Sequence, residues 1–315
     1  MKSGLVVLLG RPNVGKSTFL NQVLKDNISI VTPKAQTTRD QVRGIVNEAR
    51  GQLVFIDTPG VHRAKEGGIN EFMLQEVKRA LDGPDLVLYL IDPNSKREAE
   101  LITLEYLKKA DAKLMVIVNK ADLRKKYEGL FDWLNDWFAE LSRELEITKC
   151  KVIGMREISA QRDKGVPELM DEIFAMMPDG HPLYDDPEAL TDRSLRFIVA
   201  ELIRKQLFMH LGDEIPYSCA VEIESFLENK KPVQISAMIY VERDSQKGMV
   251  IGAGGKKIKE IGIAARAEIE KLMGEKIFLE TRVKVMEAWT SESRKMKQLG
   301  YELEHRKSTP RKRRP

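Results

Sequence analysis

Eight residues near the N-terminus have the types and the spacing of a phosphate-binding loop. Residues 10–17 read G-R-P-N-V-G-K-S and fit the pattern G-x-x-x-x-G-K-S, after an apolar run and before a helix-forming stretch. Glycines let backbone amides curl around a phosphate, and the N-terminus of the following helix adds its positive dipole end. Lys16 would reach the β- and γ-phosphates, and the Ser17 hydroxyl would ligate Mg²⁺. The segment therefore predicts a nucleoside-triphosphate site, with a chance glycine turn as the alternative.

A carboxylate for the same metal ion follows a second apolar run. Residues 57–60 read D-T-P-G and end the run 53–56. In open sheets of this kind, ligands bind at the carboxyl ends of the strands. Asp57 would hold the Mg²⁺ shell, and the amide of Gly60 would meet the γ-phosphate. On its own D-T-P-G is only a turn, so this assignment depends on the phosphate-binding loop.

A third motif selects the base. Residues 119–122 read N-K-A-D after the apolar run 114–118. The carboxylate of Asp122 can accept from both N1–H and the exocyclic amine of guanine, whereas adenine has an acceptor at N1 and lacks that amine. The motif therefore predicts GTP over ATP, with a helix N-cap as the alternative role of Asp122. Ser159 and Ala160 would add a backbone amide for the guanine O6.

These four elements, in this order, resemble the GTP-binding domain of translation-factor-related GTPases. Residues 33–40 read P-K-A-Q-T-T-R-D and are similar to the switch I segment of the Era branch of these proteins. That resemblance implies that Thr38 completes the Mg²⁺ shell with Ser17 and Asp57. Thr37 is the second choice for this ligand. The alternative interpretation of residues 33–40 is an ordinary polar surface loop. The predicted GTP contacts are Asn13, Val14, Gly15, Lys16, Ser17, Thr18, Asp57, Gly60, Asn119, Lys120, Asp122, Ser159 and Ala160.

The residue after the D-T-P-G motif limits the mechanism. Many GTPases carry there a glutamine that orients the attacking water, whereas this chain has Val61. The resemblance implies a different electrophile, a K⁺ held near the phosphates by Asn13 and switch I carbonyls in place of an arginine finger. His62 could act as a base, but a solvated loop histidine is the simpler interpretation. The predicted catalytic residues are Lys16, Thr38, Gly60 and Asn13.

A motif in the C-terminal half predicts contact with nucleic acid. Residues 250–261 read V-I-G-A-G-G-K-K-I-K-E-I and resemble the K-homology motif. In that motif a G-x-x-G loop joins two helical segments and clamps about four single-stranded nucleotides. Lys256, Lys257 and Lys259 supply positive charge, and a plain helix–turn–helix with a glycine cap is the alternative. The predicted RNA contacts are Ile251, Gly252, Ala253, Gly254, Gly255, Lys256 and Lys257.

The motifs can form one site only in a fold that brings the ends of their strands together, and the sequence predicts such a fold. Up to about residue 177, short β-rich runs alternate with stretches of helical period, which indicates an α/β fold with a mostly parallel sheet. The run 42–46 joins the next strand through a short turn and predicts an antiparallel edge strand. The expected strands are 5–9, 53–56, 86–91 and 114–118, and the expected helices are 17–24, 70–81, 97–109, 129–146 and 166–176.

A stretch rich in Pro and Asp divides the chain, whose 315 residues suggest two domains. Because this stretch breaks helix and strand alike, it is the predicted linker. The second domain is α+β, and its order of helix, strand, strand, helix, loop, helix, strand resembles the bacterial type of K-homology domain. Its expected elements are a helix at 192–211, strands at 217–227 and 233–243, a helix ending near 273 and a strand at 276–286. The predicted organisation is a GTP-binding domain 1–177, a linker 178–190, an RNA-binding domain 191–301 and a basic tail 302–315.

Charge and cysteine content limit the classes of protein to which this chain can belong. The net charge is +4, but six basic residues and no acid lie within positions 306–315, and the rest of the chain sums to −2. The positive charge is therefore a local patch for RNA or an acidic membrane, or only a solubilising tail. Cys150 and Cys219 make no disulfide framework or metal cluster. No targeting or membrane segment is visible, so the expected location is the cytoplasm.

The two modules form a narrow combination. Their order, Trp289 and residues 299–301 resemble the Era family of bacterial ribosome-assembly GTPases over residues 1 to about 301. The resemblance implies a Mg²⁺-dependent GTPase that binds the 3′ end of small-subunit ribosomal RNA and acts in assembly of the 30S subunit, with no stable protein partner. Two rival hypotheses stay open: an RNA-binding protein with an inactive nucleotide domain, and a membrane-tethered signalling GTPase. The intact motif residues oppose the hypothesis of an inactive nucleotide domain, and the lack of a lipidation motif opposes the hypothesis of a membrane tether. The basic tail is still compatible with a peripheral contact with the inner face of the cell membrane.

Overall fold

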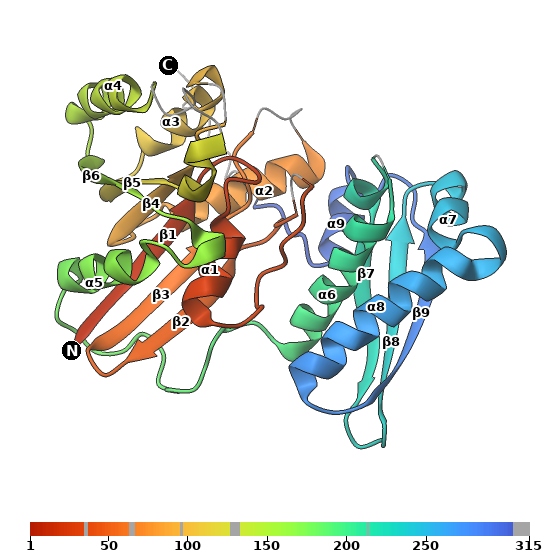
Figure 1. The fold of residues 1–315 in the computed structure, drawn as a ribbon. Coiled ribbons are helices and arrows are strands. Elements are labelled where there is room, and N and C mark those ends of the chain that lie inside the picture. Colours follow the sequence, from red (N-terminus) through yellow and green to blue (C-terminus); the bar gives the residue numbers. More distant parts are fainter. Residues whose placement is uncertain (35–36, 63–66, 95–96, 127–132, 213, 305–315) are drawn as a thin grey trace, which may run out of the picture.

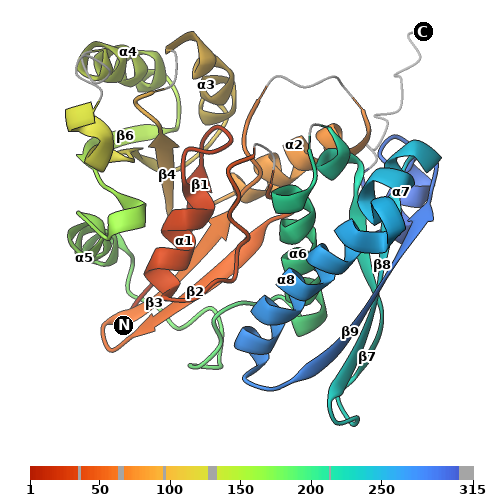
Figure 2. The same cartoon turned by 45° about the vertical axis from the view of Figure 1, so that its right-hand side comes forward.

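Two separate β-sheets organise the chain in the computed structural model (Figure 1). The structure describes residues 1–34, 37–62, 67–94, 97–126, 133–212 and 214–304. A six-stranded sheet belongs to the N-terminal half and a three-stranded sheet to the C-terminal half. The two halves lie side by side, as both views show (Figures 1 and 2). This is the predicted combination of a GTPase fold with a smaller α+β domain.

Six strands form the larger sheet, which is parallel except at one edge. They are β1 (Lys2–Leu9), β2 (Val42–Glu48), β3 (Gly51–Asp57), β4 (Leu86–Ile91), β5 (Lys113–Val118) and β6 (Lys151–Glu157). Their order is β2-β3-β1-β4-β5-β6, and β2 pairs with β3 in the antiparallel sense, which confirms the predicted edge strand. The central strands are apolar along nearly their whole length because helices cover both faces of the sheet.

Helices on the two faces of this sheet bury alternate residues of β1. The α-helices are α1 (Lys16–Leu24), α2 (Gly68–Ala80), α3 (Leu101–Leu107), α4 (Leu134–Glu146) and α5 (Val166–Met176), and the 3₁₀ turns are η1 (Arg97–Ala99), η2 (Ala121–Lys126) and η3 (Ala160–Arg162). Val6 and Leu8 pack with α1 and α5, whereas Val7 and Leu9 pack with α2, α3 and α4. The end of β1, where the phosphate-binding loop starts, is therefore fixed between two layers of helices.

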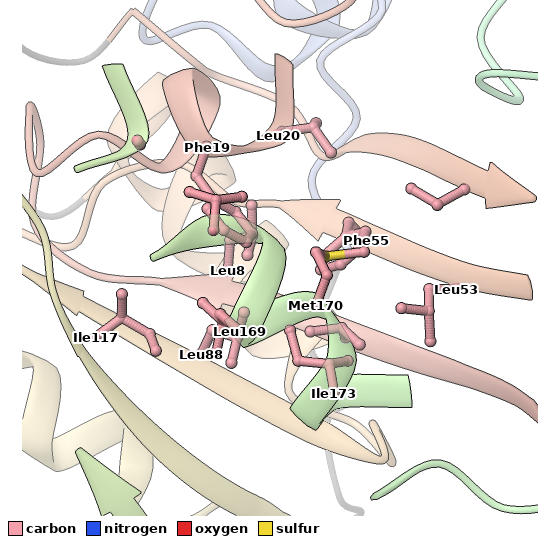
Figure 3. Packing of buried hydrophobic residues seen from close by; sticks show 14 of the residues in the cluster. Leu8, Phe19, Leu20, Leu53, Phe55, Leu88, Ile117, Leu169, Met170 and Ile173 are labelled. Atoms are coloured by element: carbon pink, nitrogen blue, oxygen red, sulfur yellow. The ribbon is translucent and has the colours of Figure 1, made fainter. Parts of the chain in front are cut away.

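Aromatic side chains pack α1 against the six-stranded sheet (Figure 3). The rings of Phe19 and Phe55 meet edge to face, with centroids 5.9 Å apart, and both are fully buried. Leu169 and Ile173 of α5 complete the same cluster. Because α1 carries the residues that follow the phosphate-binding loop, this cluster also sets the position of Lys16 and its neighbours.

The second domain packs its two longest helices on one face of a three-stranded sheet (Figure 2). Its elements are α6 (Leu195–His210), η4 (Ile215–Ser218), β7 (Ala220–Leu227), β8 (Val233–Val241), α7 (Asp244–Ile251), η5 (Ala253–Gly255), α8 (Lys256–Met273), β9 (Ile277–Val285) and α9 (Ser293–Gln298). The central strand β8 is antiparallel to β7 and parallel to β9. Ile235 and Ala237 of β8 share a buried cluster with Ile261 and Ala265 of α8.

Several observed elements differ from the predicted ones. The predicted helix 97–109 is divided into η1 and α3. The predicted strand 217–227 begins at Ala220, because Pro216 lies in η4, the 3₁₀ turn before the strand. Helix α9 was not predicted, since a six-residue helix with one buried side chain, Met296, has no readable period. Of the predicted helix 129–146, residues 129–132 lie outside the described residues.

The predicted linker is bonded to the edge of the larger sheet. The side-chain oxygen of Gln52 accepts from the amides of Leu183 and Tyr184 at 2.7 and 2.9 Å. The amide of Ile45 in β2 donates to the Leu190 carbonyl at 2.9 Å. These bonds hold the segment beside β2 and β3, while the domain boundaries themselves stay predictions.

Candidate nucleotide site and RNA-binding loop

Two glycines let the phosphate-binding loop pack closely against its neighbours. Gly10 and Gly15 have φ angles of 147° and 101°. A Cβ on Gly10 would lie 2.3 Å from the Leu90 carbonyl oxygen, and a Cβ on Gly15 would lie 2.2 Å from the side-chain nitrogen of Asn119. The loop therefore contacts β4 and the guanine motif directly, just before α1 begins at Lys16.

One cavity of about 680 Å³ joins the predicted motifs, and this volume is typical of a small-ligand site. It lies at the carboxyl ends of the strands, as expected for a sheet of this kind. Its lining also includes Lys205 and Met209 of α6, which no sequence motif indicated. The predicted GTP contacts that line it are Asn13, Gly15, Lys16, Ser17, Thr18, Gly60, Asn119, Lys120, Asp122 and Ser159, while Val14, Asp57 and Ala160 are buried beside it.

The ammonium of Lys16 lies inside the phosphate-binding loop. Its Nζ donates to the carbonyls of Gly10 and Arg11 at 2.9 and 3.0 Å. The side chain is buried, and this burial lowers its pKa to about 8, although the charges of Asp57 and Glu100 act in the opposite direction. The loop thus presents a poorly hydrated cation where phosphate groups would bind.

The buried carboxylate of Asp57 lies among hydroxyl groups at the end of β3. Oδ2 of Asp57 accepts from Ser17 Oγ at 2.6 Å and from Ser29 Oγ at 2.7 Å. Its Oδ1 is buried and has no hydrogen-bond partner in the described part of the chain. Burial raises the pKa of Asp57, against the opposing effects of Lys16 and the neighbouring hydroxyls. A buried carboxylate beside hydroxyl oxygens fits a hard cation such as Mg²⁺, which takes oxygen ligands.

Ser29 is a member of this cluster that sequence reasoning missed. It is 2% exposed, and its backbone is fixed by Asn21, whose side chain accepts from the Ser29 amide and donates to the Ser29 carbonyl. The segment after α1 has no motif that distinguishes this serine from any other loop hydroxyl. Ser29 reaches the Asp57 carboxylate only because the chain folds back after α1.

The structure separates the two threonines of switch I. The Oγ1 of Thr38 lies 3.1 Å from Ser17 Oγ, in the cluster around Asp57. The hydroxyl of Thr37 instead bonds with Thr32 Oγ1 at 2.7 Å and donates to the Lys34 carbonyl. Of the two threonines, Thr38 is therefore the one that lies in the cluster of Ser17 and Asp57. Residues 35 and 36 of the predicted segment lie outside the described residues.

The guanine motif forms a small hydrogen-bond network. Asn119 donates to the Val14 carbonyl at 2.8 Å, which connects it to the phosphate-binding loop. Asp122 lies within η2 and accepts from Ser159 Oγ at 2.6 Å, so it does not cap an α-helix. The amide of Ala160 donates to Asn119 Oδ1 at 2.9 Å, whereas the sequence suggested a contact with the guanine O6. For the Ala160 amide to contact the guanine O6, it would have to share its hydrogen bond between O6 and Asn119 or exchange one for the other.

Neither of the two described residues that directly follow Gly60 replaces the missing glutamine. Val61 is fully buried in the core, and its amide donates to the Gly10 carbonyl. His62 is half-buried rather than solvated, with Nδ1 3.0 Å from the Gly60 carbonyl oxygen. Asn13 has a left-handed φ of 63°, and its Nδ2 donates to the switch I carbonyl of Pro33 at 3.1 Å. Asn13 and a switch I carbonyl are thus neighbours, as the K⁺ hypothesis needs.

The G-x-x-G loop has the predicted form, between α7 and α8. Gly252, Gly254 and Gly255 have φ angles of 72°, 58° and 77°. A Cβ on Gly254 would meet no described atom within 4 Å, so the surface above this glycine is open. Lys256 is exposed, whereas Lys257 pairs with Glu260 at 3.0 Å. The rest of the motif anchors the loop, since Val250 and Ile261 are buried in the domain core. Ile251 is half-buried and Ala253 is exposed.

Comparison with known proteins decides the family. Residues 5–120 match a family described as 50S ribosome-binding GTPase, and residues 214–290 match the KH domain. GTPase Era of Geobacter sp. (strain M21) is 43% identical over 304 residues, which cover 96% of this chain and 98% of that protein. The chain belongs to the Era family of GTPases. GTPase Era of Carboxydothermus hydrogenoformans is also similar, at 41% identity over 95% of this chain and 98% of that protein.

Solved Era structures share the fold over almost the whole chain. A variant of Aquifex aeolicus Era bound to GDP·AlF₄⁻ superposes with a TM-score of 0.87 at 32% identity, covering 96% of this chain and all of that one. Era in complex with MgGDPNP and nucleotides 1506–1542 of 16S ribosomal RNA gives a TM-score of 0.86, also at 32% identity, with the same coverage of both chains. As an Era-family enzyme the chain hydrolyses GTP to GDP and phosphate, which opposes the hypothesis of an inactive nucleotide domain.

The lowered pKa of Lys16 predicts that nucleotide affinity falls above neutral pH. A phosphate contact requires the charged ammonium, which the free protein loses as the pH rises through about 8. GDP affinity should therefore drop about tenfold between pH 7 and pH 9. Titration calorimetry at several pH values measures this drop. The Lys16→Arg variant, which keeps its charge in this range, should bind more weakly but with a flat profile, and a flat wild-type profile would contradict the assignment.

Proposed function

We propose that this chain is a Mg²⁺-dependent GTPase that binds the 3′ end of small-subunit ribosomal RNA and acts in assembly of the 30S subunit. The observation that carries the proposal is the presence of a complete nucleotide cavity and an open G-x-x-G loop in one chain. Its support is the likeness, over 96% of the chain, to an Era structure that holds MgGDPNP and a segment of 16S ribosomal RNA.

In the nucleotide site, each side chain has a distinct task. Lys16 neutralises the β- and γ-phosphates, and the amide of Gly60 contacts the γ-phosphate. Ser17, Thr38 and Asp57 hold Mg²⁺, which supplies charge compensation for phosphoryl transfer when it is bound. The remaining GTP contacts are Asn13, Val14, Gly15 and Thr18 around the phosphates, and Asn119, Lys120, Asp122, Ser159 and Ala160 around the base.

Hydrolysis relies on electrostatics more than on a general base. Val61 cannot orient water, and the ring of His62 is bonded to the Gly60 carbonyl. Asn13 and the neighbouring carbonyl of Pro33 would hold a K⁺, which would supply positive charge beside the phosphates in the role that an arginine finger has elsewhere. Together with Lys16, Thr38 and Gly60, Asn13 belongs to the catalytic set.

The RNA site is the loop from Ile251 to Lys257. Gly252, Gly254 and Gly255 allow the nucleic-acid backbone to approach without side-chain clashes, and Ala253 adds only a methyl group. Lys256 and Lys257 supply phosphate contacts that carry little sequence information.

The boundaries of the two functional units are 1–177 and 191–301, joined by the linker 178–190. Where it has been described, the chain has no helix of sufficient length and apolar character to cross a bilayer. We place the protein in the cytoplasm. The basic tail 302–315, most of which lies outside the described residues, contacts RNA or the inner face of the membrane, and a liposome assay with and without residues 306–315 separates these roles.

Asp122→Asn should exchange guanine recognition for xanthine recognition. The amide can donate to the xanthine C2 carbonyl but cannot accept from both N–H groups of guanine. The loss of a hydrogen bond to a charged group corresponds to at least about tenfold in GTP affinity. Competition binding with GTP and XTP measures the exchange, and Asp163→Asn on the exposed turn after η3 is the matched control. A variant with the wild-type GTP-to-XTP ratio would show that Asp122 has only a structural role.

Replacing Na⁺ by K⁺ should raise the rate of GTP hydrolysis, because Asn13 and the Pro33 carbonyl lie together beside the phosphate site. Asn13→Ala should remove the difference between the two salts while GDP still binds. Equal wild-type rates in both salts, or a large loss of activity in His62→Ala, would contradict this mechanism.

Gly254→Asp should abolish RNA binding and leave GTP hydrolysis without RNA near the wild-type rate. The new carboxylate adds like-charge repulsion where the RNA backbone approaches, while a Cβ at this position meets no described protein atom within 4 Å. Gly274→Asp at the other end of α8 is a close control, since its φ is 70° and its Cβ would also lie in open space. If Gly254→Asp keeps its RNA affinity, the loop is a helix cap and the basic tail becomes the leading RNA contact.

A further inference from the structure

Three consecutive residues of switch I connect the nucleotide site with the second domain. The side chain of Thr38 lies beside Ser17 in the metal cluster. The carbonyl of Thr37, one residue earlier, accepts from the guanidinium of Arg204 in α6 at 2.5 Å. The side chain of Arg39, one residue later, crosses to η4. The position of Thr38 is therefore determined by both domains.

Arg39 is buried at the end of η4. It is 4% exposed, and its guanidinium donates to the carbonyls of Cys219 at 2.7 Å, Tyr217 at 2.6 Å and Pro216 at 3.3 Å. The Cys219 amide makes the last helical hydrogen bond of η4, to the Pro216 carbonyl at 3.3 Å, and the guanidinium bonds mainly to the carbonyls that follow it, those of Tyr217 and Cys219. A guanidinium with several donors in a rigid plane suits this cluster of acceptors better than an ammonium.

Two aromatic rings from the C-terminal segment complete the pocket for Arg39. The guanidinium carbon lies 5.6 Å from the ring centroid of Trp289 and 6.0 Å from that of Tyr301, within the range of cation–π attraction. These two rings stack with centroids 5.7 Å apart. The indole of Trp289 donates to the Ser218 carbonyl at 2.7 Å, which accounts for the remaining carbonyl at the end of η4. These hydrogen-bond and ring partners of the Arg39 guanidinium thus lie in η4 and at the start of β7, and in the C-terminal extension, residues 286–304 after β9.

The same extension contacts α2, the helix that follows the D-T-P-G motif. The amide of Ile69 donates to the Thr290 carbonyl at 2.7 Å. Gly68 permits this approach, since its Cβ would lie 2.1 Å from that carbonyl oxygen. Tyr301 also packs edge to face on Phe72, with centroids 5.4 Å apart. Switch I and α2 thus both contact the C-terminal extension that follows β9.

We propose that Arg39 is a positioning residue for GTP hydrolysis, which fastens switch I to the second domain and so holds Thr38 beside Ser17 and Asp57. The inference rests on the proposed role of Thr38 as a ligand of Mg²⁺. Because GDP has no γ-phosphate, its binding depends on the phosphate-binding loop and the guanine motif, and not on switch I. Arg39 should therefore matter for hydrolysis and for the Mg²⁺ requirement of hydrolysis, but not for GDP affinity.

The test compares single variants of the full chain. Arg39→Met removes the guanidinium, and we expect kcat for GTP to fall at least about tenfold with a higher Mg²⁺ requirement, the change expected for losing charge-assisted hydrogen bonds. GDP affinity should stay within about twofold of wild type. Arg39→Lys, which can reach only some of the carbonyls, should recover part of kcat. The matched control is Arg50→Met, since Arg50 also covers an aromatic ring, that of Phe174 at 4.1 Å, but lies away from the domain interface.

Thr38→Ala separates failure of the inference from failure of the proposed function. Loss of hydrolysis in Thr38→Ala together with a wild-type kcat and Mg²⁺ requirement in Arg39→Met would overturn the inference alone. Wild-type hydrolysis in Thr38→Ala would overturn the proposed role of Thr38 itself. A parallel fall in kcat and GDP affinity in Arg39→Met would also overturn the inference, because it would indicate a general structural role. If Arg39→Met melts below the assay temperature, the same criteria apply to Arg39→Lys.

Discussion

The nucleotide site contains a buried ammonium and a buried carboxylate that do not form a direct hydrogen bond. Lys16 is held by loop carbonyls and Asp57 by hydroxyls. Burial shifts the pKa of each group towards its neutral form, downward for Lys16 and upward for Asp57. Phosphate groups and a divalent cation supply the charges that favour the ionised form of each. The rest of the fold must keep these groups apart and dry, which the two helix layers over β1 and β3 accomplish.

Much of this site could be predicted because its residues are contiguous in the sequence. Each motif lies at the end of a strand with an apolar run: the loop 10–17 follows β1, the D-T-P-G turn ends β3, and the N-K-A-D motif follows β5. Parallel strands bring these carboxyl ends to one edge of the sheet. Local hydrogen-bond partners were harder to anticipate. The amide of Ala160 bonds to Asn119, and the ring of His62 bonds to a backbone carbonyl, because both depend on side-chain packing that no pattern records.

Contacts between distant parts of the chain could not be predicted from the sequence. Ser29 lies in a loop without a motif, yet it donates to Asp57. Lys205 lies on a helix of the second domain and still lines the nucleotide cavity. Trp289 resembled its family counterpart without an evident task, and the structure places it under the guanidinium of Arg39. The contacts of Lys205 and Trp289 join the two domains, and any coupling of binding free energies through them is necessarily reciprocal.

The most direct test of this account is hydrogen–deuterium exchange of the full chain bound to GDP or to a non-hydrolysable GTP analogue. Residues 37–41, the end of switch I and the residue that follows it, are joined to residues 215–220 of the second domain through Arg39. The account predicts that the amides of both segments become more protected together when the analogue replaces GDP. Protection confined to residues 37–41, with residues 215–220 exchanging as they do with GDP, would contradict it.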